Sequence, residues 1–460
     1  MTVVAIDDTD SREHGMCTTY LATRLAERVE AAGGTVQRRL LVRLNPAVEH
    51  KTRGNAALAI HTDLATTDAF ALAREELADL AIDSDPRTSP GVVVADLDDP
   101  DPQETATPRG IATDAIPDDV VDFAARAMRE KLDLDEALDL IEANDWAHAG
   151  DAAEGCEVAG RGRIGALAAV GAPAAFDDWT HEHISYREFD RCGTPREVDR
   201  DTVFAAADWG YPAVWDTVDR EEGEAVCVPN APGPILHGIR GDDPDACREV
   251  AARIDSEPVD RAATFLTNQG TDAHVDRGAI GELREGAGYH VDGVVASDPA
   301  TKRGGHVFFK LEAQGDDAVS GEGKVDCAAF EPTKHFRDRV RALRAGDEIA
   351  VCGEFDDGTI KLEKFAVRSL VETELVTPTC PDCGRSMGSA GRDQGYRCRD
   401  CDTAAPGKVA ADLDRDLERG WYEVPPCARR HVAKPLVRDG IDGANADDTG
   451  DDAAPLHPEK

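Results

Sequence analysis

The stretch Val3-Val4-Ala5-Ile6, followed directly by Asp7-Asp8-Thr9-Asp10, decides how the rest of the chain is interpreted. Four consecutive apolar residues, most of them β-branched, predict a short buried strand. Three carboxylates follow where that strand ends, and strand ends are where α/β folds place ligands. Three carboxylates so close together repel one another unless a positively charged group lies between them, which favours a metal site. The alternative is an acidic turn.

A helix is predicted to follow, beginning near Thr18. Apolar residues recur four apart from Leu21 to Val29, and Gly33-Gly34 supplies the stop. Thr18 or Thr19 is therefore expected to cap the helix. Mg²⁺ prefers hard oxygen ligands, and a helix N-terminus suits phosphate, so a cation and a phosphate between them would explain both features.

The net charge of the chain is −40, yet 41% of its residues are hydrophobic, which is too many for a disordered protein. The composition indicates a halophilic host, whose concentrated cytoplasm shortens the Debye length to roughly 3 Å or less. The charge then says little about partners, because salt weakens the repulsion between an acidic protein and nucleic acid.

The length of 460 residues predicts three or four domains. No run approaches the apolar length of a membrane span, and the N-terminus lacks a signal-peptide pattern, so we expect a cytoplasmic protein without a membrane segment. Cytosolic thiols stay reduced, so the 12 cysteines are not expected to form a disulfide framework.

Two further loops are candidates for phosphate binding. Lys51 and Arg53 lie in a glycine-containing loop of the same small unit as the aspartates, and either clamp a polyphosphate or form a solvated loop. Gly160, Gly162 and Gly165 match GxGxxG at a helix start. A dinucleotide site would need a preceding strand and a later acidic residue, and neither is clear. Phosphate binding and tight helix packing both remain open for this turn.

Residues 179–271 contain separate strand-like and helical segments, which suggests an α+β unit of ferredoxin-like type. One of the predicted strands covers Ala225–Val228. The unit ends in Thr267-Asn268-Gln269-Gly270-Thr271-Asp272, six small or polar residues directly after a strand. This segment is either a plain polar turn or a loop that recognises amine or guanidinium groups.

Residues 290–368 contain five predicted short strands, with a helix between the third and fourth. That order is the layout of an OB-fold barrel, whose second and third strands face oligonucleotides. Phe308 lies on the polar face of the second strand, opposite Phe309. It is either a base-stacking platform or ordinary barrel packing.

Two CxxC pairs form the strongest local signal: Cys380 with Cys383, and Cys398 with Cys401. Their spacing predicts four thiolates around a structural Zn²⁺, without an open coordination position. Such a ribbon is too small to fold without its metal. A basic cluster follows, a candidate for RNA contact that contains Arg429, Arg430 and Lys434. The tail from Asp439 is expected to be disordered.

These motifs, in this order over nearly the whole chain, resemble one family, the archaeal tRNA(Ile) 2-agmatinylcytidine synthetases (TiaS), in a haloarchaeal form. The resemblance implies an ATP-dependent ligase that attaches agmatine to ring position 2 of the wobble cytidine in the CAU anticodon of tRNA(Ile). The product is agmatidine, formed through phosphorylation of the cytidine carbonyl oxygen. No obligate protein partner is expected.

The resemblance also assigns expected roles to residues. Catalysis would involve Asp7, Asp8, Asp10 and Thr18, with Mg²⁺ on Asp7 and Asp8 and with Thr18 as phosphoryl acceptor or helix cap. ATP would be bound by Thr9, Lys51, Arg53, Gly160, Gly162 and Gly165. Apart from the resemblance, the residues themselves suggest contacts with agmatine or RNA at Asn268, Gln269, Asp272, Phe308, Arg429, Arg430 and Lys434.

The expected domains are a kinase-like α/β catalytic domain over 1–175, a ferredoxin-like α+β domain over 176–285, an OB-fold over 286–370, a zinc ribbon with basic tail over 376–436, and an acidic disordered tail over 439–460. An alternative from a different class of function is a non-catalytic protein that binds single-stranded nucleic acid through the barrel and the ribbon. This alternative does not explain the N-terminal motifs. An ATP-dependent RNA kinase or nucleotidyltransferase that does not use agmatine is a third possibility.

Overall fold

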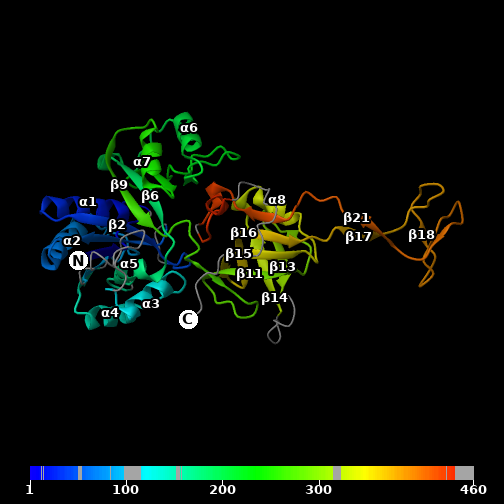
Figure 1. The fold of residues 1–460 in the computed structure, drawn as a ribbon, viewed down its shortest axis with the longest axis horizontal. Coiled ribbons are helices and arrows are strands. Elements are labelled where there is room, and N and C mark those ends of the chain that lie inside the picture. Colours follow the sequence, from blue (N-terminus) through cyan, green and yellow to red (C-terminus); the bar gives the residue numbers. More distant parts are fainter. Residues whose placement is uncertain are drawn as a thin grey trace.

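The computed structural model describes residues 1–11, 13, 15–49, 54–82, 84–97, 115–151, 156, 158–313, 323–430 and 432–440. Figure 1 shows three parts: a sheet covered by helices, a β-barrel beside it, and a small cysteine-bearing ribbon that projects from the barrel on a two-stranded stalk. The protein is thus a multidomain fold of mixed α+β type.

The first half of a nine-stranded sheet is built around the predicted N-terminal strand. Its strands are β1 (Thr2–Asp7), β2 (Val36–Arg43), β3 (Ala56–Thr62), β4 (Gly91–Asp96) and β5 (Ala147–Gly150). β1 lies between β3 and β4 and is antiparallel to both. This half of the sheet is therefore antiparallel around β1, because β1 pairs with two strands that run against it.

Helices cover both faces of this half-sheet, which explains why β1 is apolar on both sides. The helices are α1 (Thr18–Ala31), α2 (Thr66–Leu80), α3 (Asp118–Ala127), α4 (Leu134–Ala143) and α5 (Gly162–Ala175). Val3 and Ala5 pack in a core with α3, α4 and α5, whereas Val4 and Ile6 pack in the opposite core with α1 and α2. Burial on both faces fixes the position at which β1 ends.

The second half of the sheet follows α5 in the chain. Its strands are β6 (Thr180–Arg187), β7 (Val214–Trp215), β8 (Ile235–Gly241) and β9 (Val259–Thr267). The helices between these strands are η1 (Phe189–Arg191), α6 (Arg200–Gly210) and α7 (Pro244–Ala252). The two halves join because β9 pairs in parallel with β2, Leu40 opposite Leu266 and Leu41 opposite Thr267. One sheet therefore runs through both predicted N-terminal domains.

The predicted strand over Ala225–Val228 is wrong, because the residues form turns. The Val228 N–H donates to the Ala225 carbonyl, and the Cys227 N–H donates to the Thr217 carbonyl. These bonds curl the segment instead of leaving it extended, and Pro229 follows directly.

The five predicted barrel strands and their intervening helix are confirmed. They are β11 (Ala287–Val295), β13 (Val307–Glu312), β14 (Lys324–Ala329), β15 (Glu348–Asp356) and β16 (Thr359–Ser369), with α8 (Phe336–Arg341) between β14 and β15. The barrel closes because β11 pairs with both β15 and β13. Short elements at its edges are β10 (Val275–Arg277), β12 (Ala300–Thr301) and η3 (Glu331–Thr333).

The ribbon is an excursion between two strands of the barrel. Its stalk is β17 (Thr373–Val376) paired with β21 (Val409–Asp412), and its head carries β18 (Gly388–Ser389), β19 (Tyr396–Arg397) and β20 (Ala404–Ala405). The chain then returns as β22 (Gly420–Glu423) against β16, followed by η4 (Pro426–Ala428) and η5 (Leu436–Asp439). Arg438 pairs with Asp178, so this returning segment ties the barrel to the sheet.

Candidate active site

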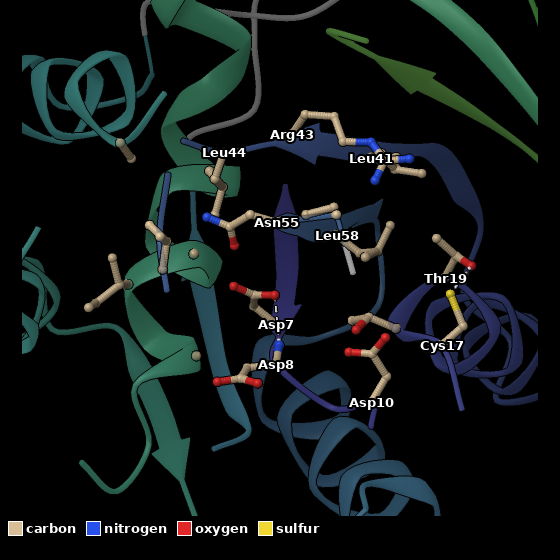
Figure 2. Close-up of a pocket in the computed structure, with 18 of the residues that line it drawn as sticks. Asp7, Asp8, Asp10, Cys17, Thr19, Leu41, Arg43, Leu44, Asn55 and Leu58 are labelled. Carbon is tan, nitrogen blue, oxygen red and sulfur yellow. Dashed lines mark hydrogen bonds between the residues drawn. The ribbon is translucent and has the colours of Figure 1, made fainter. Parts of the chain in front are cut away.

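A cavity of about 570 Å³ opens where the two halves of the sheet meet. The three aspartates that follow β1 line it, together with the first residues of α1 and α5. β2, β6 and β8 contribute Arg43, Glu182 and Arg240. Figure 2 shows Asp7, Asp8 and Asp10 gathered below the end of β1, with Arg43 across the cavity from them.

The turn after β1 holds its carboxylates in a defined arrangement. Asp8 has a positive φ of 59°, a conformation that Asp tolerates better than most residues. Its N–H donates to Asp7 Oδ1 at 2.7 Å, and Arg161 Nη2 donates to Asp8 Oδ2 at 2.6 Å. One carboxylate is thus held by the backbone and the other by a guanidinium group at the start of α5.

The electrostatics of Asp7 and Asp8 favour a bound cation. Burial raises the pKa of Asp7 well above its usual value, and the neighbouring Asp8 carboxylate raises it further. Burial also raises the pKa of Asp8 to about 6, although Arg161 opposes the shift. A divalent cation between the two groups would offset both costs, because it stabilises the ionised forms. These oxygen donors fit Mg²⁺ in kind.

The glycine turn before α5 brings the helix against the end of β1. A Cβ atom on Gly165 would lie 2.0 Å from Asp7 Oδ2, and one on Gly162 would lie 2.6 Å from the Asp7 carbonyl oxygen. The Gly162 N–H donates to the Ser89 carbonyl at 2.9 Å, and the Arg161 N–H donates to Ser89 Oγ at 3.0 Å. These bonds favour the packing explanation over a phosphate cradle; phosphate binding by Gly160, Gly162 and Gly165 stays a prediction.

Thr18 lines the cavity but does not cap the helix. The N-cap residue of α1 is Cys17, with φ −159° and ψ 131°, and no side chain caps the helix. Thr18 is the first helical residue, and its Oγ1 instead accepts a hydrogen bond from Thr9 Oγ1 at 3.1 Å. The predicted cap is wrong, because the chain is still extended at Cys17, whereas the Thr18 hydroxyl remains available as a predicted phosphoryl acceptor.

Lys51 and Arg53 lie outside the described residues, so their predicted contact with phosphate stays a prediction. The described residues on either side of them, Glu49, Gly54 and Asn55, line the cavity. The loop that carries both cations therefore begins and ends at the site.

Arg43, Glu182 and Arg240 form a cluster in the cavity that the sequence did not reveal. Arg43 Nη2 lies 3.5 Å from Glu182 Oε2, and Arg240 Nε lies 3.3 Å from Glu182 Oε1. Glu182 and Arg240 are cross-strand partners on β6 and β8. Nothing local in the sequence linked Arg43 to a carboxylate in the other half of the sheet.

The loop after β9 supports Arg43 and does not line the cavity. Asn268 Oδ1 accepts from the Arg43 N–H at 2.7 Å, and Gln269 Oε1 accepts from Arg43 Nε at 2.7 Å. Asp272 faces the barrel, where its Oδ1 accepts from the Lys434 N–H at 2.7 Å. The predicted contact of these loop residues with agmatine stays a prediction, and their described partners are protein groups.

The four cysteines of the ribbon converge as predicted. The sulfur atoms of Cys380, Cys383, Cys398 and Cys401 all lie within 4.8 Å of one another. Cys383 Sγ and Cys398 Sγ are 3.6 Å apart, close to the separation of about 3.8 Å that a tetrahedron of Zn–S bonds requires. The donor set therefore fits one structural zinc ion, at the end of the molecule far from the cavity (Figure 1).

Phe308 is placed on the outer face of the barrel. It is half-buried, whereas Val307 and Phe309 on either side point into the barrel core. Lys302 Nζ lies 3.9 Å from the centre of the Phe308 ring, and Phe330 meets it edge-on with ring centres 6.0 Å apart. Lys302 covers one face of the ring, so a base could stack there only on the other face or after Lys302 moves, and stacking on Phe308 stays a prediction.

The basic cluster of the returning segment is mostly engaged by carboxylates. Arg429 is buried, with its Nε 2.7 Å from Asp216 and its Nη1 2.9 Å from Glu423. Arg430 pairs with Glu354, and Lys434 Nζ lies 2.6 Å from Asp439. These pairs fasten the segment, so a direct contact of Arg429 with RNA would require it to leave a buried ion pair.

Comparison with known proteins agrees with this arrangement. Models of the TiaS TCKD domain, the TiaS FLD domain and the TiaS C-terminal zinc ribbon domain match residues 3–66, 160–274 and 377–417. A tRNA(Ile) 2-agmatinylcytidine synthetase TiaS of Haloquadratum walsbyi is 54% identical, with both chains fully covered. The same enzyme of Methanosarcina mazei is 42% identical over 95% of this chain and 97% of its own.

Solved structures are similar over almost the whole length. A complex of TiaS with its isoleucine tRNA and ATP superposes with a TM-score of 0.81 at 39% identity, covering 96% of this chain and 99% of that one. A complex of TiaS with the same tRNA, AMPCPP and agmatine gives 0.79 at 37% identity, covering 96% and 98%. Among the described residues, no helix is long and apolar enough to cross a membrane. The chain belongs to the TiaS family.

Proposed function

We propose that this protein is an ATP-dependent ligase that joins agmatine to ring position 2 of the wobble cytidine of tRNA(Ile), forming agmatidine. The observation that carries the proposal is the cavity in which the half-buried Asp7 and Asp8 meet the first residues of α1 and α5. The relatives similar over the full chain are named as synthetases of this product, and solved relatives hold an isoleucine tRNA, ATP and agmatine.

Asp7, Asp8 and Asp10 are the residues that would hold Mg²⁺ in this cavity. The ion would neutralise the phosphate charge of ATP, which is most of what catalysis of phosphoryl transfer requires. Arg161 keeps the Asp8 carboxylate in place, and the Asp8 N–H does the same for Asp7. The Thr18 hydroxyl is the proposed phosphoryl acceptor on the protein, and Thr9 orients it.

The chemistry needs ATP because a ring carbonyl oxygen is a poor leaving group at neutral pH. Transfer of a phosphoryl group to that oxygen converts it into a good leaving group. The primary amine of agmatine then attacks the ring carbon, the new C–N bond forms, and the C–O bond breaks with its electron pair leaving on phosphate. The amine nitrogen loses its proton to solvent, and holding the reacting atoms together supplies much of the rate.

Agmatine is a dication, and the cavity offers carboxylates for it beyond the three aspartates of the turn. Glu49, Glu130 and Asp133 also line the wall. Most of these carboxylates already pair with a cation: Glu182 with Arg43 and Arg240, Glu49 with Lys131, and Glu130 with Arg126 and Arg284. Among the described residues no ion pair is formed by Asp133, which is therefore the best suited. An amine directed at the wobble base would thus enter between carboxylates on the side of α3 and α4.

The remaining parts of the chain would bind the RNA. We assign residues 1–175 as the kinase-like domain, 176–285 as ferredoxin-like, 286–370 as an OB-fold and 376–436 as the zinc ribbon with its basic tail. Phe308 on the open face of the barrel is the proposed stacking platform. The protein would act in the cytoplasm, at the high salt that its charge of −40 indicates.

The test is incorporation of labelled agmatine. Purified protein in high KCl is incubated with unmodified tRNA(Ile), ATP, Mg²⁺ and labelled agmatine, and label on the tRNA is measured. We expect label that depends on ATP and on the CAU anticodon. If no label appears, the proposal is wrong. Phosphorylation of the RNA without any dependence on agmatine would instead indicate an RNA kinase.

A further inference from the structure

The cavity contains a group of cations that the reaction described so far does not use. Arg43 on β2 and Arg240 on β8 flank the single carboxylate of Glu182 on β6, whose side chain is 5% exposed. The two arginine side chains are 22% and 18% exposed. Within this group of three side chains, two guanidinium groups against one carboxylate leave one positive charge in excess at the cavity wall.

The unused donors of this group face the cavity. The Arg240 side chain makes one hydrogen bond with the described residues, from Nε to Glu182 Oε1, so its two Nη nitrogens have no hydrogen-bond partner among those residues. Arg43 uses Nε for Gln269 and Nη2 for Glu182, which leaves its Nη1. A charged, half-desolvated guanidinium group is costly to leave unpaired.

The other arginines that line the cavity are occupied differently. Arg196 donates from Nε and Nη2 to three backbone carbonyls, those of Ile235, Ala231 and Gly233, at 2.7–3.1 Å. Arg161 is held by Asp8. Arg43 and Arg240 differ from both in sharing the single carboxylate of Glu182.

The surrounding structure keeps this group open and in place. Gly238 lies on β8 two residues before Arg240, and a Cβ atom there would lie 3.0 Å from Glu182 Oε1. The backbone and side chain of Arg43 are bound by Asn268 and Gln269. Burial lowers the pKa of Arg43, Glu182 opposes this, and the nearby Arg240 charge lowers it again. An anion would remove that last repulsion.

We propose that Arg43 and Arg240 form an anion subsite for a phosphate group, separate from the aspartates that would hold Mg²⁺. Planar guanidinium forks match phosphate oxygens, and the shared carboxylate of Glu182 fixes the forks in position. The phosphate belongs either to the RNA backbone next to the target cytidine or to ATP. The inference rests on the proposed function, since it names a part of a substrate that the same cavity would receive.

The test measures binding of two probes to Arg240→Gln in high KCl: ATP, and an anticodon stem-loop RNA of tRNA(Ile). The subsite predicts a loss of roughly 10-fold or more in affinity for one probe and little change for the other. Loss of RNA affinity should come with a shallower salt dependence, by about 0.7 in the slope of log K against log salt. The probe that weakens identifies the source of the phosphate.

Two variants serve as controls. Arg248→Gln removes an exposed charge from α7, outside the cavity lining, and should leave both affinities unchanged. Arg240→Lys restores the charge without the fork, so it should bind with intermediate affinity and recover the salt slope of the wild-type protein. Thermal unfolding of each variant shows whether the fold is intact, and Arg240→Lys carries the test if Arg240→Gln does not fold.

Unchanged affinity of Arg240→Gln and Arg240→Lys for both probes would overturn the subsite. Equal losses in Arg248→Gln would overturn it as well, because the effect would then be one of general charge. Neither result touches the proposed function, which is tested separately by labelled agmatine on the wild-type protein. Conversely, absence of agmatine incorporation leaves the binding measurements interpretable as evidence for or against a phosphate site.

Discussion

Gly165 offers a sharp test of whether the position of Asp7 controls the reaction. A Cβ atom at Gly165 would stand 2.0 Å from Asp7 Oδ2 and 2.9 Å from Leu44 Cδ1, whereas ordinary contact begins at 3.4 Å. In Gly165→Ala the carboxylate or the helix must therefore move by about 1.4 Å. A misplacement of about 1 Å at a reacting centre costs on the order of 100-fold in rate.

We accordingly expect Gly165→Ala to lower ATP-dependent agmatine incorporation by roughly 100-fold, which corresponds to about 2.7 kcal/mol of transition-state stabilisation. Overpacking should also destabilise the fold by about 1–3 kcal/mol. The assay is the initial rate of label transfer at saturating RNA, with thermal unfolding measured on the same preparation.

The matched control is Gly171→Ala, further along the same helix. A Cβ atom there would lie 2.4 Å from the Val120 carbonyl oxygen and 2.8 Å from Ala124 Cβ, against α3 and away from Asp7. It should destabilise the protein to a similar degree and leave the rate of the folded fraction near that of the wild-type protein. If both variants lose activity equally, or if Gly165→Ala keeps full activity, the position of Asp7 does not control the reaction.

The other predictions concern the metal site, the ribbon and the barrel. Asp8→Asn should abolish ATP turnover while leaving tRNA binding near the wild-type level, and unchanged turnover would remove Asp8 from the metal role. Because the pKa of Asp8 is about 6 in the fold against 3.8 in the unfolded chain, the metal-free protein should lose stability, by up to roughly 3 kcal/mol, as pH rises from about 4 to 6. Added Mg²⁺ should raise the melting temperature more at pH 7 than at pH 5, and an equal effect at both values would argue against carboxylate ligands. Native mass spectrometry should find one zinc ion that Cys398→Ser loses; a wild-type protein without zinc would contradict the structural role. Phe308→Ala should weaken RNA binding by about 1–3 kcal/mol with little change in stability, whereas a large fall in melting temperature would show that the ring serves only the barrel.

The local sequence was enough to predict several parts of the molecule. An apolar β-branched run predicted β1, and the CxxC spacing predicted the cysteine cluster, because both are set by neighbours in the chain. Alternation along β13 placed Phe308 on the outer face and Phe309 in the core, since the side-chain period of a strand is two residues. The order of the barrel strands followed from turns and strand lengths.

Other expectations failed where the result depended on pairing partners. Thr18 was expected to cap α1, but the backbone is still extended at Cys17, and Thr9 binds the Thr18 hydroxyl. Residues 225–228 have the composition of a strand, yet a local bond from the Val228 N–H to the Ala225 carbonyl and one from the Cys227 N–H to the Thr217 carbonyl curl them into turns.

By itself the sequence determined the family, the carboxylate turn after β1, the four zinc ligands and the barrel, because each is carried by residues adjacent or periodic in the chain. Only the tertiary structure decided that β2 and β9 join two predicted domains into one sheet. That pairing brings Arg43 to Glu182 and Arg240 and encloses the cavity between the halves. Charge contacts between segments so far apart in the chain depend on how the strands pack, and no local pattern encodes them.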